Sequence, residues 1–150
     1  MFEISLKIER PAATVFAYLQ DIEAAPRWYS AVESVTRLSD GPVGCGSRFV
    51  FTRQIAGRRI QNTVEVTEFQ DEKLLTLASV SGPTPFSYRY RLDRDGAATI
   101  LHLEGTISGD GLGGPIALLA PLASRFFEQG MRANIANLKR ILEARLGPDA

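Results

Sequence analysis

Residues 48–64, RFVFTRQIAGRRIQNTV, are the clearest indication of the fold, because apolar and polar residues alternate along them on both sides of an Ala-Gly turn. This pattern predicts a β-hairpin with residues 56 and 57 as its two-residue loop. In that register Ile55 opposes Arg58 and Phe51 opposes Asn62. A slip by one residue would turn both phenylalanines outward, so the register is well specified. One face of the hairpin then carries Phe49, Phe51, Arg53, Ile60, Asn62 and Val64.

Two helical segments are predicted between the first strand and this hairpin. Residues 2–8 alternate as a strand with one buried face, and Pro11 suits the first position of a helix. Apolar residues then recur at helical spacing within residues 12–19. Residues 21–30, which include Trp28, predict a second short helix.

A second hairpin is predicted later in the chain, where Asp95-Gly96 separates two alternating strands. Before it, residues 74–80 predict another strand, but leucines fall on both of its faces and leave its orientation open. With Asp95-Gly96 as the loop, the predicted pairs are Tyr90 with Leu101 and Tyr88 with Leu103 on the apolar face, and Arg89 with His102 on the outer face.

The last segment predicts a long amphipathic helix. Pro115 and Pro121 each suit a helix start, the first helix short and the second long, and Gly147-Pro148 suits the end. The apolar stripe of the long helix consists of Phe127, Met131, Ile135, Leu138 and Leu142. The order of elements predicts an α+β fold, in which a curved antiparallel sheet of about seven strands surrounds the C-terminal helix. We expect residues 1–150 to form a single ligand-binding domain, because chains usually divide only beyond about 250 residues.

Composition excludes several classes of function. Lys and Arg together number 17, as do Asp and Glu, so no excess positive charge favours nucleic acid. One cysteine and one histidine are too few for the usual zinc sites, and acidic residues do not cluster for a hard cation. We therefore expect no metal and no cofactor. The N-terminus lacks a signal-peptide pattern, and the apolar run 115–123 is far shorter than the roughly 20 residues of a membrane span. These features predict a cytoplasmic protein without stable membrane insertion.

The inward face of the predicted sheet indicates a ligand chamber. A curved sheet that grips a helix tends to leave space between them, and apolar space with a few polar groups is the usual form of a small-molecule site. The predicted ligand-binding residues are Trp28, Phe49, Phe51, Arg53, Asn62, Tyr88, Tyr90, Leu101, Phe127 and Met131. No catalytic residue can be assigned from a motif.

Each polar candidate has an alternative interpretation. Arg53 either holds a ligand carboxylate or phenolate or, as its position near a turn favours, lies at the sheet rim and reaches water. Asn62 either makes a structural hydrogen bond or contacts ligand. Tyr88 and Tyr90 are wall residues more often than hydrogen-bond donors to a substrate carbonyl. Trp28 is more often a core anchor than part of a chamber entrance.

Three further features favour structural roles. Strand parity places His102 on the outer face beside Glu104, which favours a surface histidine over a general base. Cys45 lies between two glycines and is expected to be a plain free thiol. The apolar run 116–120 predicts a homodimer contact or simple packing, with a lid or a membrane contact as the alternatives.

Several short stretches carry a resemblance over nearly the whole chain: IERPAATVF (8–16), Trp28, GSRF (46–49), ATIL (98–101) and NLKRIL (137–142). With them the sequence resembles the SRPBCC superfamily, whose helix-grip fold is shared by START domains, birch-pollen-allergen (Bet v 1-like) proteins and bacterial polyketide cyclase/dehydrase-like proteins. The resemblance implies an internal cavity for a small hydrophobic ligand, which is aromatic, polyketide-like or lipid-like. It also leaves open a cyclase, aromatase or dehydratase and, third, a protein-interaction module.

Overall fold

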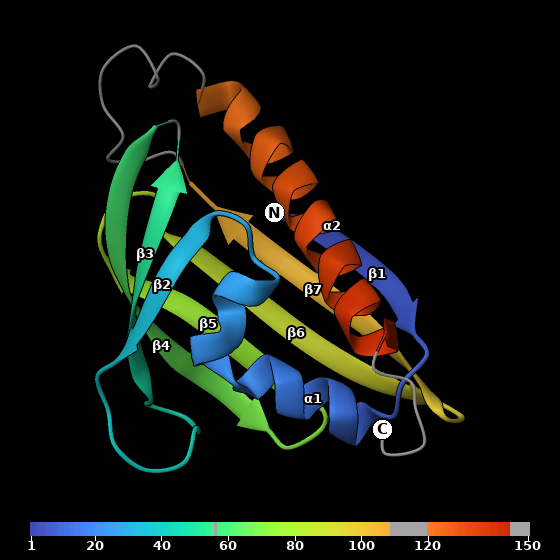
Figure 1. Ribbon diagram of the computed structural model, residues 1–150. Coiled ribbons are helices and arrows are strands. Elements are labelled where there is room, and N and C mark those ends of the chain that lie inside the picture. Colours follow the sequence, from blue (N-terminus) through green and yellow to red (C-terminus); the bar gives the residue numbers. More distant parts are fainter. Residues whose placement is uncertain (56, 109–119, 145–150) are drawn as a thin grey trace.

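A single antiparallel sheet forms the body of the molecule. The computed structural model describes residues 1–55, 57–108 and 120–144 (Figure 1). Within them the strand order is β1-β7-β6-β5-β4-β3-β2, so β1 and β2 are the sheet edges. The strands are β1 (Phe2–Ile8), β2 (Val32–Arg37), β3 (Arg48–Ile55), β4 (Arg58–Gln70), β5 (Leu74–Ser81), β6 (Phe86–Asp95) and β7 (Ala98–Ile107). The helices are α1 (Ala12–Gln20), the short 3₁₀ helix η1 (Ile22–Arg27) and α2 (Ala120–Ala144).

The long helix α2 lies against the curved sheet and contacts β1 and β7 (Figure 1). Its predicted apolar stripe is confirmed, because Met131, Ile135, Leu138 and Leu142 are all at most 2% exposed. Phe127, at the N-terminal end of the stripe, is only half-buried. The predictions for Pro115, for the run 116–119 and for Gly147-Pro148 lie outside the described residues. None of the described helices has the length and apolar character that a membrane span requires.

The first two helices differ from the prediction in detail. Pro11 is the N-cap of α1 rather than its first helical residue, with an extended ψ of 152°. The second segment is a 3₁₀ helix that ends at Arg27, so Trp28 and Tyr29 follow it instead of lying inside it. Both aromatic side chains are nevertheless buried in the core.

The β3–β4 hairpin has the predicted register, with Ile55 opposite Arg58 and Phe51 opposite Asn62. The β6–β7 register is wrong in the prediction by two residues. Asp95 pairs with Ala98, so Gly96, with φ of 61°, is the first loop residue rather than the second. The shift is even, so each side chain keeps its predicted face. The observed pairs are Tyr90 with Leu103, Leu92 with Leu101, Arg91 with His102 and Arg89 with Glu104.

The orientation of β5, which the sequence left open, follows from its neighbour. Leu75 pairs with Tyr90 and Leu77 with Tyr88, which places both leucines on the inner face with the tyrosines. Leu74 and Thr76 are buried as well, although they alternate with the inner leucines. When both faces of a strand are buried, apolar and polar residues do not alternate along it, so the sequence pattern does not show which face points to the helix.

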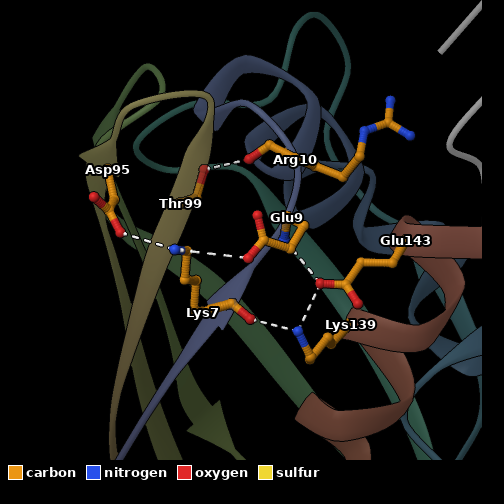
Figure 2. Close-up of polar contacts among 7 residues, drawn as sticks. All are labelled: Lys7, Glu9, Arg10, Asp95, Thr99, Lys139 and Glu143. Atoms are coloured by element: carbon orange, nitrogen blue, oxygen red, sulfur yellow. Dashed lines mark hydrogen bonds and ion pairs between the residues drawn. The ribbon is translucent and has the colours of Figure 1, made fainter.

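A group of polar contacts, here called the C-terminal clasp, fixes the end of α2 to the β1–α1 connection (Figure 2). The buried Arg10 donates from Nη1 to the Leu142 carbonyl at 3.2 Å. The Glu9 amide donates to the Glu143 carboxylate at 2.8 Å. Lys139 donates from Nζ to the Lys7 carbonyl at 2.7 Å and to Glu143 at 2.6 Å. The clasp therefore satisfies main-chain groups at both the helix end and the strand end.

Candidate functional site

A pocket of about 290 Å³ lies beside the N-terminal half of α2. Four segments line it: residues 126–134 of α2, residues 29–31 after η1, the end of β3 and Tyr88 near the start of β6. Its apolar wall comes from Ile55, Phe126, Phe127 and Met131. Phe126 is 65% exposed, so part of this wall faces solvent. The pocket is large enough to hold a small organic molecule against aromatic and aliphatic surface.

Arg53 forms the polar end of the pocket and is 1% exposed. The expectation that Arg53 reaches water at the sheet rim is therefore wrong. Its Nη2 donates to Asn62 Oδ1 at 2.7 Å, to the Thr84 carbonyl at 2.9 Å and to Thr84 Oγ1 at 2.5 Å. The guanidinium also lies over the Phe86 ring, 4.6 Å from its centroid. These partners are all neutral, and the Arg53 Nε is buried without a partner among the described residues.

The electrostatics of Arg53 follow from its burial. Loss of solvent disfavours the charged guanidinium and lowers its pKa below the ordinary value, while Tyr29 and Tyr88 act in the opposite direction. A buried cation with only neutral partners is costly in a protein interior. An electron-rich oxygen placed in the pocket would reduce that cost.

Two tyrosine hydroxyls complete the polar end. Tyr29 donates to the Tyr88 hydroxyl at 2.9 Å, and both residues line the pocket. Burial raises the pKa of Tyr29, against the hydrogen bond with Tyr88 and the charge of Arg53, which lower it. Burial also raises the pKa of Tyr88. Both hydroxyls therefore remain protonated near neutral pH and can act as hydrogen-bond donors.

The backbone brings these groups together from distant parts of the sequence. Strand alternation turns Arg53 inward together with Phe49 and Phe51. The segment 82–85 then folds over β4 and places Thr84, with φ of 48° and no exposed surface, against the guanidinium. Gly82 permits this approach, because a Cβ there would lie 2.3 Å from the Gln61 carbonyl oxygen.

The structure divides the predicted ligand-binding residues into two groups. Arg53, Tyr88, Phe127 and Met131 line the pocket together. The remainder are buried but do not line it: Trp28, Phe49, Phe51, Asn62, Tyr90 and Leu101. Asn62 makes a hydrogen bond to Arg53, which is the structural role given above as one of its two interpretations. Trp28 packs edge-on against Tyr90, with ring centroids 6.3 Å apart.

Sequence reasoning missed Asn134 and Thr84. Asn134 is 4% exposed and accepts hydrogen bonds from the Ser30 amide at 3.1 Å and hydroxyl at 3.3 Å. The sequence does place Asn134 three residues after Met131, beside the apolar stripe of the helix. A buried polar residue at that position needs a hydrogen-bond partner, so this position could have indicated a role for Asn134. Nothing in the local pattern around Thr84 indicates that it reaches Arg53.

The remaining candidates lie away from the pocket. His102 lies on the outer face, as predicted, but its ring nitrogens contact Ser5 at 2.8 Å and Asp93 at 2.9 Å rather than Glu104. Cys45 is an exposed free thiol. Within the described residues no three His, Cys, Asp or Glu side chains gather in a way that could hold a metal ion.

Solved structures with the same architecture support the fold. The Zhui aromatase/cyclase from Streptomyces sp. R1128 is 15% identical, with a TM-score of 0.82 over 99% of this chain and 96% of that one. A protein from Thermus thermophilus is 19% identical, with a TM-score of 0.78 over 97% and 98%. A START superfamily protein from Mycobacterium smegmatis is 16% identical, with a TM-score of 0.71 over 93% and 97%. These likenesses establish the helix-grip fold.

Sequence comparison gives the family. A search of curated proteins finds no match. The sequence model of a family described as polyketide cyclase / dehydrase and lipid transport matches residues 1–143. This match covers nearly the whole chain and agrees with the observed fold and with the predicted resemblance. The chain therefore belongs to the polyketide cyclase/dehydrase and lipid transport family.

Proposed function

We propose that this protein, as one ligand-binding domain, binds a small hydrophobic molecule in the pocket beside α2. The ligand body lies against Phe126, Phe127 and Met131, and a polar oxygen of the ligand faces Arg53 and Tyr88. The observation that carries the proposal is the buried Arg53, which lines the pocket and has only neutral protein partners. An apolar pocket with one charged group at its end favours an oriented ligand over a nonspecific lipid.

Native mass spectrometry of the purified protein is the first experiment. A copurified small molecule would identify the ligand, and the same spectrum measures whether the chain forms a homodimer, which stays a prediction. Hydrophobic ligands should also raise Tm, because binding to the folded state alone stabilises it by RT ln(1 + [L]/Kd). Absence of any bound molecule, together with no ligand-induced shift across an aromatic and fatty-acid panel, would contradict the proposal.

Arg53→Met tests the polar end directly. Hydrogen bonds to charged groups contribute about 1.5–3 kcal/mol, so the variant should bind the same ligand roughly 10- to 150-fold more weakly. Arg48→Met is the matched control, because Arg48 lies on the same strand but faces solvent and pairs with Glu65. Equal affinity of both variants would show that Arg53 does not contact the ligand.

A second candidate, a cyclase-type enzyme, is favoured by the same donor group. Arg53 and the Tyr88 hydroxyl could stabilise negative charge that develops on a substrate carbonyl oxygen. Turnover of a polyketide-like substrate should then fall about 100-fold in Tyr88→Phe, mainly through kcat. Tyr90→Phe is the control, because Tyr90 faces inward on the same strand but does not line the pocket.

A further inference from the structure

We propose that the pocket prefers ligands with a single polar oxygen, such as a phenol or a ketone, and disfavours carboxylates. The reason is that Asn62 and Thr84 occupy the guanidinium nitrogen that a carboxylate needs. This inference rests on the proposed function and assigns its specificity to two residues that do not belong to the apolar wall.

A guanidinium binds a carboxylate best through two parallel N–H bonds. Only two of its edges offer such a pair, because one edge presents Nε with Nη2 and the other presents Nη1 with Nη2. Both edges therefore depend on Nη2. When Nη2 is already bonded within the protein, the guanidinium keeps its charge but cannot bind a carboxylate in a bidentate way at either edge.

In this protein Nη2 of Arg53 is fully used. It carries two hydrogens and has four acceptors in bonding range: Asn62 Oδ1 at 2.7 Å, Thr84 Oγ1 at 2.5 Å, the Thr84 carbonyl at 2.9 Å and the Pro83 carbonyl at 3.5 Å. Asn62 is 1% exposed and Thr84 is not exposed at all. Solvent therefore does not compete for these bonds.

The acceptors are themselves held in place. The Asn62 amide donates to the Pro83 carbonyl at 2.7 Å, to Ser79 Oγ at 3.1 Å and to the Ser81 carbonyl at 3.3 Å. The bond to Pro83 ties the segment 82–85 to β4 on the side where Gly82 approaches it, and the other two bonds tie Asn62 to β5. A ligand carboxylate would have to displace this network before it could reach Nη2.

The donors that remain suit one oxygen atom. The hydrogen bonds of Arg53 to Asn62 and Thr84 run through Nη2, and the neutral Tyr29 hydroxyl also interacts with the guanidinium. Nη1 is not used by the bonds to Asn62 and Thr84, so it is the nitrogen that we assign to the ligand. The Tyr88 hydroxyl receives a bond from Tyr29 and keeps its own hydrogen to donate. A phenol or ketone oxygen can accept from both donors. The nearby charge also favours an acidic phenol, because its ionised oxygen would be the counterion that the described residues do not supply.

Two matched probes test this inference, 2-naphthol and 2-naphthoate, which share the ring system and differ in the polar group. Isothermal titration with the wild-type protein should give a Kd at least about tenfold lower for 2-naphthol. Bound 2-naphthol should also ionise at a lower pH than the free compound, which its absorbance reports. Naphthoate binding as tightly as naphthol, or more tightly, would overturn the inference and leave the proposed function intact. Failure of both probes to bind would overturn the inference, and the proposed function would fall only if the native mass spectrum and the ligand panel were negative as well.

A double variant tests the residues responsible. Asn62→Leu with Thr84→Val removes both side-chain acceptors and leaves Nη2 with the Thr84 carbonyl and the more distant Pro83 carbonyl, so the preference for naphthol should fall at least about tenfold. Ser79→Ala is the control, because Ser79 contacts Asn62 but not Arg53, and it should keep the wild-type preference. Circular dichroism establishes whether the variants fold.

If the double variant does not fold, the wild-type preference for naphthol and the ionisation of bound naphthol still test the inference. A folded double variant with unchanged preference would contradict the role of Asn62 and Thr84.

Discussion

The two ends of α2 are held in opposite ways. At its C-terminal end the helix receives a hydrogen bond from Arg10. It also bonds to the main chain of Lys7 and Glu9 through Lys139 and Glu143 (Figure 2). At its N-terminal end the helix lines a pocket, and the charged group there, Arg53, keeps a buried Nε without a partner in the described residues. The contrast indicates that one end of the helix stabilises the fold and the other end is available for ligand.

The largest expected difference between the two ends concerns the core. Leu142→Ala, beside the clasp, should cost about 2–5 kcal/mol of unfolding free energy, because Leu142 is fully packed and its truncation leaves a cavity. Phe126→Ala, at the pocket end, should change stability by less than about 0.5 kcal/mol, because that ring is largely exposed. Urea denaturation of both variants measures the difference. Similar losses at the two ends would remove the contrast.

Arg10→Met tests the polar part of the clasp. Methionine keeps most of the side-chain volume but leaves the Leu142 carbonyl without its buried donor, so we expect a loss of about 1–3 kcal/mol. Denaturant midpoints give the value, and ligand affinity at the pocket should stay unchanged. A weaker ligand affinity would show that the two ends of α2 are coupled.

The next effect depends on pH. Hydrogen bonds from Lys139 and from the Glu9 amide hold the pKa of Glu143 below its ordinary value of 4.5. The folded state therefore favours the ionised carboxylate. This contribution is present above the ordinary value and is lost as the pH falls through the lower folded-state pKa.

Glu143→Gln should therefore lose less stability than the wild type when the pH is lowered through this range. The effect should be smaller than that of Arg10→Met, because Glu143 is partly exposed to solvent. Thermal denaturation at a series of pH values measures it. Identical acid profiles would indicate that Glu143 contributes nothing to the clasp.

The smallest effect is expected for a surface ion pair at the pocket end of the same helix. Arg132 and Glu128 lie one helical turn apart, and Arg132 Nη2 is 3.1 Å from Glu128 Oε2. The Arg132 side chain is exposed and the Glu128 side chain is partly exposed. Arg132→Met should cost about 0.3–0.5 kcal/mol at most, as for other pairs of this spacing. A loss as large as that of Arg10→Met would contradict the view that buried contacts of the clasp, rather than surface charges, fix the helix.

Much of the fold could be predicted because its signals are local. Alternation assigned Phe49, Phe51 and Arg53 to the inner face, and helical spacing assigned Met131 and Ile135 to the buried stripe. Both follow from side-chain direction over a few residues. The β6–β7 register was missed because a loop at residues 95–96 and a loop at residues 96–97 place every side chain of the two strands on the same face. The alternation of apolar and polar residues therefore does not distinguish them.

The pocket was predictable only in part. Four of its residues were predicted. Six others were predicted as well, five because they face inward on strands and Trp28 as part of an entrance, but the structure packs all six in the interior: Trp28, Phe49, Phe51, Asn62, Tyr90 and Leu101. Facing inward does not separate a cavity wall from a filled interior. That distinction depends on how side chains from several elements fill a common volume.

Local sequence patterns were enough to predict the strand faces, the gripping helix and the inward direction of Arg53, because each depends on backbone periodicity within one element. The groups that Arg53 contacts in the interior follow instead from the three-dimensional arrangement of the strands and loops. Thr84 lies 31 positions further along the chain and reaches the guanidinium through a left-handed turn that brings the segment 82–85 over β4. Such a contact depends on loop closure and packing across strands, which no local pattern encodes.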